Sequence, residues 1–115
     1  MNERESEAIL LLANSLLGVG KPAEAAELLR GLAEVDAKDV RIGRLLALAL
    51  LSLGKYAEAE PVTRDLVRIA EGNDLPPALF FYAHALWGSG KLDECRRQVD
   101  RYAASLAVLN KDTKR

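Results

Sequence analysis

Apolar residues recur at intervals of three and four along three separated stretches of the chain, which is the spacing of one face of an α-helix. Each stretch stops just before a Gly-Lys pair. The apolar positions are Ile9, Leu12, Ala13 and Leu16, then Leu46, Ala47 and Leu50, then Leu79, Ala83 and Leu86. The pattern predicts a first helix before each pair and a second helix after it, near 23–35, 57–71 and 92–108.

The segments around the Gly-Lys pairs resemble one another closely. Residues 16–25, 50–59 and 86–95 each carry Gly-Lys, and then Glu followed by a small residue. The aligned glycines are 34 residues apart in the first interval and 36 in the second, and 34 is the period of tetratricopeptide repeats. The two extra residues fit within residues 72–77, which are rich in turn formers.

We therefore predict an all-α fold in which three tetratricopeptide-like hairpins stack as a short right-handed superhelix. The expected repeats cover about 6–39, 40–75 and 76–109, within one domain of residues 1–110 followed by a basic tail at 111–115. A single hairpin cannot bury its own apolar face, so stacking creates the core. No polar capping helix follows the third repeat, and a partner or a second copy is expected to cover that end.

Several positions have expected roles in each hairpin. Gly20, Gly54 and Gly90 are expected to adopt the left-handed conformation that ends a helix. Small residues are expected where the two helices approach most closely, and these are Ala25, Ala59 and Cys95. Pro61 is the exception to a regular pattern, and we expect the second helix of that repeat to begin late or to bend there.

The amino-acid composition and charge argue against several classes of protein function. The 115 residues are 50% hydrophobic and 29% charged, with a net charge of −1, as in globular proteins. Basic and acidic residues are interspersed, which argues against nucleic-acid binding. The N-terminal residues are acidic, unlike those of a secretory signal. The longest apolar run, residues 45–51, is too short to span a membrane. The single cysteine allows no internal disulfide. We expect a cytoplasmic protein.

Catalytic chemistry has little support in the sequence. His84 lacks an evident partner as a general base, and Cys95 is expected to be a buried, inert thiol. One histidine and one cysteine do not build a zinc site, and the Gly-Lys pairs lack the other features of a phosphate loop. We expect no enzyme activity, no metal and no cofactor.

The first helices of such repeats usually line a concave groove. Aligning the repeats gives an inward-facing, partner-binding set of Leu10, Asn14, Leu17, Arg41, Arg44, Leu48, Leu51, Phe80, His84 and Trp87. Phe80, His84 and Trp87 share one helix face and are expected to form an aromatic wall, although Phe80 and Trp87 could instead be core residues. Arg41 and Arg44 either contact an acidic group of the guest or belong to a solvated helix face.

The groove differs from those that clamp a C-terminal carboxylate. Leu10 and Leu48 stand where such a clamp needs polar groups, and only Asn14 matches it. Recognition of a chaperone's C-terminal tail is therefore disfavoured.

Over about residues 5–109 the chain resembles the small three-repeat tetratricopeptide chaperones of bacterial type III secretion. The similarity rests on length, repeat number, the Gly-Lys-x-x-Glu-Ala turns and the apolar groove. Residues 7–14 and 41–46 resemble the SctY (YscY-like) type most closely.

The resemblance implies a virulence-associated protein of the bacterial cytoplasm that binds a small secreted SctX-like component as a heterodimer. A component of the export gate is a further candidate partner. The alternatives are a needle-subunit chaperone of the same system, a general protein-interaction scaffold and a self-associating structural protein.

Overall fold

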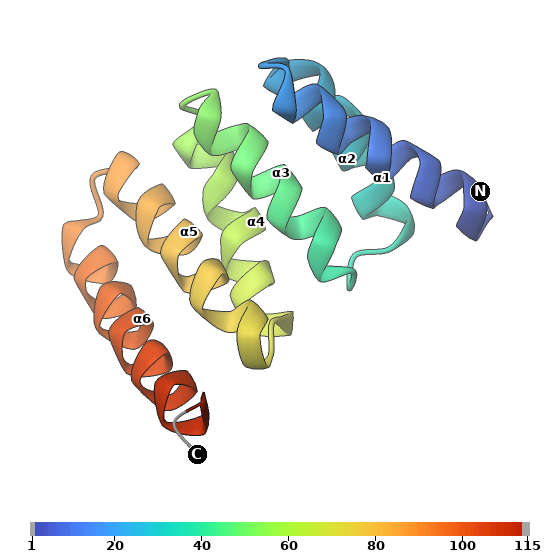
Figure 1. Cartoon of the computed structure of the whole chain (residues 1–115). Helices are drawn as coiled ribbons and strands as arrows, with labels where there is room; N and C mark the ends of the chain where they lie inside the picture. Colours follow the sequence, from blue (N-terminus) through green and yellow to red (C-terminus); the bar gives the residue numbers. More distant parts are fainter. Residues whose placement is uncertain (1, 114–115) are drawn as a thin grey trace.

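The computed structural model describes residues 2–113, and this part of the chain is entirely helical (Figure 1). The helices are α1 (Glu3–Gly18), α2 (Pro22–Val35), α3 (Val40–Ser52), α4 (Tyr56–Ile69), α5 (Leu75–Gly88) and α6 (Leu92–Thr113), with a short 3₁₀ turn η1 (Gly72–Asp74) before α5. The predicted all-α fold is confirmed.

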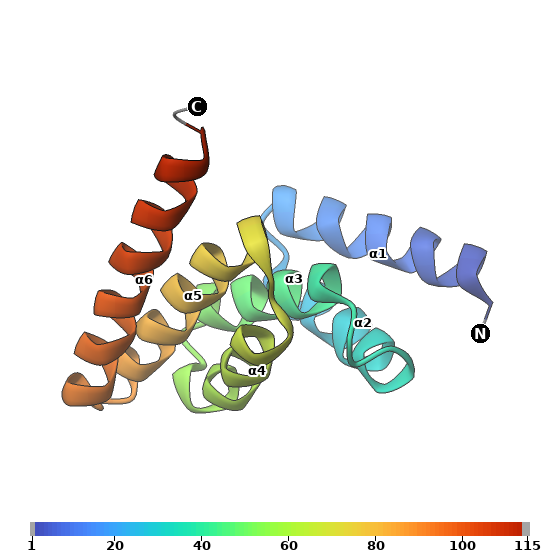
Figure 2. The ribbon, with the colours of Figure 1, turned by 90° about the horizontal axis from the view of Figure 1, so that it is seen from below.

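Consecutive helices pack as three hairpins, α1 with α2, α3 with α4, and α5 with α6, and each hairpin packs on the next. Figure 2 shows α1 on one side and α6 on the other, with α3 and α5 between them and α2 and α4 beneath. The first helices and α6 therefore form the inner surface of the stack.

The three Gly-Lys turns have the same backbone geometry. Gly20, Gly54 and Gly90 have φ values of 78°, 70° and 79°, the left-handed region that glycine adopts without steric cost. The amide of the lysine that follows each glycine donates back to a carbonyl near the end of the first helix, at N···O distances of 2.8, 2.9 and 2.9 Å. These bonds are those of the Schellman motif, so the predicted helix ends are confirmed.

The same lysines also begin the second helices. The carbonyl oxygens of Lys21, Lys55 and Lys91 accept hydrogen bonds from the amides of the residues four positions later. Each lysine backbone therefore closes one helix with its amide and opens the next with its carbonyl, which keeps the turn short.

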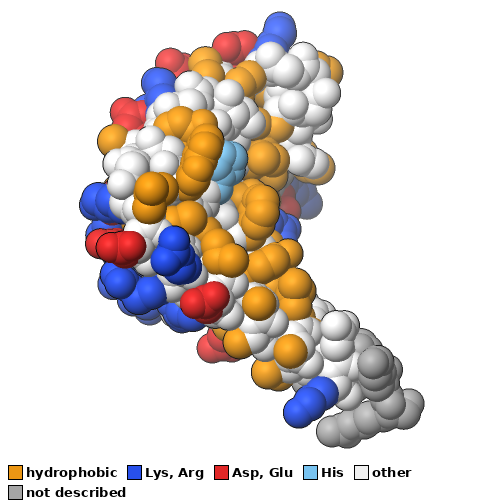
Figure 3. All heavy atoms as spheres, turned by 90° about the vertical axis from the view of Figure 1, so that its left-hand side faces the viewer, with side chains coloured by type: hydrophobic (Ala, Val, Ile, Leu, Met, Phe, Trp, Pro, Cys, Tyr) orange, Lys and Arg blue, Asp and Glu red, His pale blue; other side chains and the backbone are white. Residues whose placement is uncertain are grey.

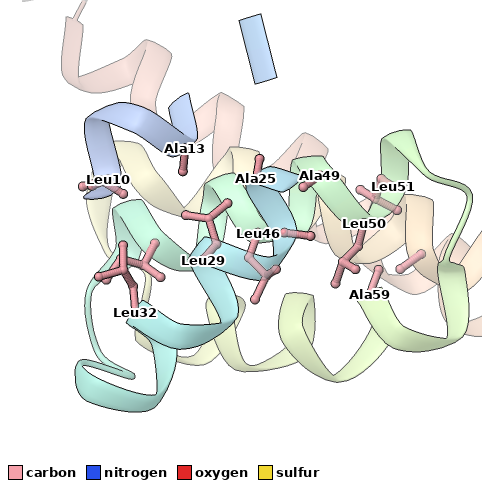
Figure 4. Packing of buried hydrophobic residues seen from close by; sticks show 13 residues of the cluster. Leu10, Ala13, Ala25, Leu29, Leu32, Leu46, Ala49, Leu50, Leu51 and Ala59 are labelled. Atoms are coloured by element: carbon pink, nitrogen blue, oxygen red, sulfur yellow. The ribbon is translucent and has the colours of Figure 1, made fainter. Parts of the chain in front are cut away.

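Leucine and alanine fill the core between the hairpins. Figure 4 shows Leu29, Leu46 and Leu50 pointing into the space between the helices. Ala25 and Ala59, expected at the closest approach of each hairpin, are fully buried. Cys95, the third member of that set, is only partly buried; it lies on α6, the last helix that the structure describes.

Helix α4 corrects the expected late start at Pro61. The helix begins at Tyr56 and continues through the proline. The Lys55 carbonyl already receives the amide of Ala59, so the first turn is formed upstream of Pro61. Proline lacks only the amide that would have bonded to Ala57.

Helix α6 is longer than expected. It has 22 residues and ends at Thr113 rather than near 108. Residues 111–113, expected in the basic tail, belong to this helix, and residues 114 and 115 lie outside the described residues. The alanine-rich sequence of 103–107 favours this continuation, because alanine has the highest helix propensity.

Candidate partner-binding groove

Helix α5 presents three aromatic side chains to the inner surface. The ring centroid of His84 lies 6.4 Å from that of Phe80 and 6.1 Å from that of Trp87. Phe80 is 52% exposed and Trp87 58% exposed, so neither is a core residue. The three side chains expected to form one aromatic wall therefore lie together, and two of them remain open to contact.

Two tyrosines from other helices extend this wall. Tyr56, the first residue of α4, lies 5.7 Å from His84 and 6.3 Å from Trp87 between ring centroids. Tyr102 of α6 lies 5.9 Å from Phe80. Neither tyrosine belongs to the predicted partner-binding set, because that set contains only residues of the first helices. Figure 3 shows hydrophobic side chains gathered around the pale blue histidine.

An apolar hollow of about 450 Å³ adjoins the aromatic wall between α5 and α6. It is lined by Asn73, Pro76, Pro77, Phe80, Phe81, Tyr102, Leu106 and Leu109. The last turns of α6 provide the two leucines, and Leu109 comes from the part of the helix beyond the predicted end near 108. We call the aromatic wall and this hollow together the aromatic groove.

The inner surface near α1 and α3 is more polar. A hollow of about 230 Å³ there is lined by Glu7, Leu10, Leu11, Asn14, Arg41, Arg44 and Leu45. Asn14 is exposed, and Arg44 is half exposed, with its guanidinium 3.6 Å from the Asp74 carboxylate. A guest that enters the aromatic groove could therefore meet polar groups at this end.

Arg41 is bound to carboxylates of its own chain. Its guanidinium donates to both oxygens of Asp39, at 3.2 and 2.8 Å, and to both oxygens of Glu7, at 3.2 and 2.7 Å. These bonds raise the pKa of Arg41 and lower that of Asp39. Glu7 belongs to α1, so Arg41 connects the first repeat to the second. An acidic guest would have to displace these partners.

The remaining members of the expected set differ in exposure. Leu48 is 40% exposed and Leu17 is partly buried, whereas Leu10 and Leu51 are buried in the core. Leu10 and Leu51 have little surface to offer a guest, although Leu10 borders the polar hollow. Because the helices twist relative to one another, equivalent positions of successive first helices are not equally exposed.

His84 contacts three aromatic rings, those of Tyr56, Phe80 and Trp87. Within the described part of the chain, no three His, Cys, Asp or Glu side chains gather as a metal site. None of the described helices is long and apolar enough to span a bilayer. The arrangement is one of rings and aliphatic side chains suited to apolar contact.

Comparison with solved structures finds the same fold in a secretion protein. The crystal structure of the Yersinia enterocolitica type III secretion translocator chaperone SycD, in an alternative dimer, superimposes with a TM-score of 0.75 at 18% sequence identity. The alignment covers 99% of this chain and 98% of SycD. A comparison with curated protein sequences gave no match.

Family profiles agree with the structure. Two tetratricopeptide repeat profiles match, one over residues 10–74 and the other over residues 76–101. The first begins within α1 and covers the rest of the two N-terminal hairpins, and the second covers α5 and about the first half of α6. The chain belongs to the tetratricopeptide repeat family.

Proposed function

We propose that this protein is a type III secretion chaperone that holds an apolar segment of a small secreted component in the aromatic groove. One observation carries the proposal: Phe80 and Trp87 are more than half exposed in one aromatic wall, and Phe80 also lines the adjoining apolar hollow. Exposed aromatic residues in a hollow surface favour a partner-binding role.

The groove is suited to binding without rearrangement. Its rings pack on one another from α4, α5 and α6, so their positions are held before any guest arrives. Apolar area that a guest covers contributes about 25 cal/mol per Å². A preformed surface keeps more of that free energy, because few side chains lose freedom on binding.

The similarity in fold to a translocator chaperone supports the secretion role. An exported component must be kept from aggregating before export, and an apolar groove can shield its exposed segments. The specific assignment is an SctY-like chaperone of the bacterial cytoplasm that forms a heterodimer with an SctX-like guest. A needle subunit or an export-gate component is the alternative partner in the same system.

The proposal is tested by affinity purification of the tagged chain from its native cytoplasm, followed by mass determination of stoichiometric partners. We expect one small secretion component. Co-expression with that component should raise the soluble yield of both chains. A mixture of unrelated proteins would contradict the secretion role.

A general scaffold is the competing function. A scaffold would be well behaved alone and would bind short peptides weakly, whereas the proposed chaperone would gain stability from one guest. Thermal unfolding of the purified chain with and without its co-purified partner separates the two. A rise in Tm that grows with partner concentration supports the chaperone.

A further inference from the structure

The second and third repeats show which residues of a hairpin contact the preceding hairpin. Ile42 and Ala49 of α3 are buried, and so are the equivalent residues of α5, Ala78 and Ala85. Ala78 packs with Leu66 of α4. These residues of a first helix therefore form the contact with the preceding hairpin.

The same positions of α1, the first helix that the structure describes, are exposed. Ala8 and Ser15 correspond to Ile42 and Ala49 by the 34-residue repeat, and both are exposed. Leu11 and Leu12 between them are 67% and 52% exposed. We call these four residues the head face.

The opposite end of the stack shows the complementary face. Leu29 of α2 and Thr63 of α4 are equivalent, and both are fully buried beneath the following hairpin. Val99 of α6 occupies the same position and is 48% exposed, while Leu92, equivalent to Tyr56, is 59% exposed. We call Leu92, Arg96, Val99 and Ala103 the tail face.

We infer that the head face of one copy of this chain docks on the tail face of a second copy and continues the stack. Each face has the residue spacing of an interface that forms within the chain, so the second copy offers the matching surface. The inference does not depend on the aromatic groove or its guest.

Charge favours this pairing over the pairing of like ends. Residues 1–39, the first repeat and the residues before it, carry eight acidic and four basic side chains, whereas residues 76–115, the third repeat and the residues after it, carry seven basic and four acidic ones. Two head ends or two tail ends would repel each other, while a head and a tail attract. Such head-to-tail contacts do not close on themselves in a pair, so they build short chains of increasing length.

One residue sets the strength of the contact. Within the chain, the Lys91 ammonium reaches the Glu60 carboxylate at 2.6 Å. At a junction between copies, the repeat places Arg96 in the position of Glu60, opposite Lys21 of the second copy. These like charges weaken the contact and make it dependent on concentration. Arg96→Glu reproduces the ion pair found between the second and third repeats and should tighten association about twofold to fivefold.

Sedimentation velocity of the full chain over a range of concentrations tests the inference. We expect the average mass to rise with concentration for the native chain and to rise earlier for Arg96→Glu. Leu12→Lys on the head face and Val99→Lys on the tail face should each give monomers. Val108→Lys, an exposed position of α6 outside the tail face, should leave association unchanged.

Mixing Leu12→Lys with Val99→Lys tests whether the head face binds the tail face. Each retains one intact face, so an equimolar mixture should form dimers that grow no further. A native chain that stays monomeric, or a single variant that still dimerises alone, overturns the inference. If circular dichroism shows that a lysine variant has lost its helical signal, Leu12→Ser and Val99→Ser replace the pair.

Discussion

The ring of Tyr56 lies so close to Gly88 that a Cβ atom added there would come within 2.1 Å of two ring carbons. Tyr56 opens α4 and Gly88 ends α5, so the contact joins the second repeat to the third. The same ring borders the aromatic groove through His84 and Trp87. Stability at this junction and the shape of the groove are therefore linked through one side chain.

Gly88→Ala should destabilise the fold, because the added methyl group overlaps the Tyr56 ring. Overpacking of this kind costs about 1–3 kcal/mol. Urea unfolding followed by circular dichroism measures the loss. Gly18 occupies the equivalent position of the first repeat, and nothing lies within 4 Å of a Cβ added there. Gly18→Ala should therefore be neutral or stabilising, and equal effects at the two sites would contradict the Tyr56 contact.

Replacing Lys91 by alanine should lower stability more than replacing Lys21, although both lysines have the same place in their turns. Lys91 bonds to Glu60, a largely buried carboxylate, whereas no ion pair forms at Lys21 among the described residues. Glu60 raises the pKa of Lys91. The stabilisation that the Lys91–Glu60 ion pair gives the fold is therefore complete below about pH 10. It is lost as the pH rises through the raised pKa of Lys91 in the folded state. Unfolding of the two variants at neutral and alkaline pH checks this.

Asp39 should make stability depend on pH in the acidic range. Its carboxylate accepts the Arg41 amide at 2.9 Å as the N-cap of α3 and also pairs with the Arg41 guanidinium, which lowers the pKa of Asp39. A lowered folded pKa stabilises the fold above the unfolded value of about 3.9, and that stabilisation is lost as pH falls through the folded pKa. Urea midpoints of the native chain should fall over this range.

Asp39→Asn keeps a capping side chain but removes the ionised group. Between pH 5 and pH 3, the stability of this variant should therefore change less than that of the native chain. The ordinary carboxyl pKa of about 3.9 sets this pH range. Asp39→Ala should lose about 1 kcal/mol through the missing cap even where the native carboxylate is ionised. If the native chain and Asp39→Asn respond to acid in the same way, other carboxylates carry the effect.

The double variant Leu48→Glu and Phe80→Glu should abolish binding of the co-purified guest and leave the helical circular-dichroism signal intact. Both side chains are exposed on the inner surface, so charge there should oppose an apolar guest without entering the core. Val108→Glu provides the control, since Val108 is 59% exposed but does not line the hollow. Unfolding of the double variant would instead place these residues in the core.

The repeat could be predicted from the sequence because its strongest signals are local. The left-handed glycines end helices through their own backbone, and the small residues expected in each hairpin, Ala25 and Ala59, are fully buried. These features need no knowledge of how one hairpin lies on the next. The helix expected near 57–71 begins at Tyr56, and only the late start at Pro61 was wrong, because the Lys55 carbonyl already closes the first turn upstream of the proline.

The composition of the groove depends on the twist between hairpins, which the repeat length alone does not give. Tyr102 reaches Phe80 only because α6 returns beside α5, and Arg41 meets Glu7 across 34 residues of sequence. Leu51 was assigned to the groove by alignment, yet the twist turns it into the core. The aromatic residues of α5 were found because they share one helix.

The Gly-Lys turns allow the amino-acid sequence of the inner surface to vary. Each hairpin is closed by main-chain hydrogen bonds of one glycine and one lysine, and the lysine side chain takes no part in those bonds. Inner-surface residues that make no contact between repeats can therefore be exchanged without altering the path of the chain. Related sequences could acquire different guests through a few substitutions on α5 and α6 while the helices keep their places.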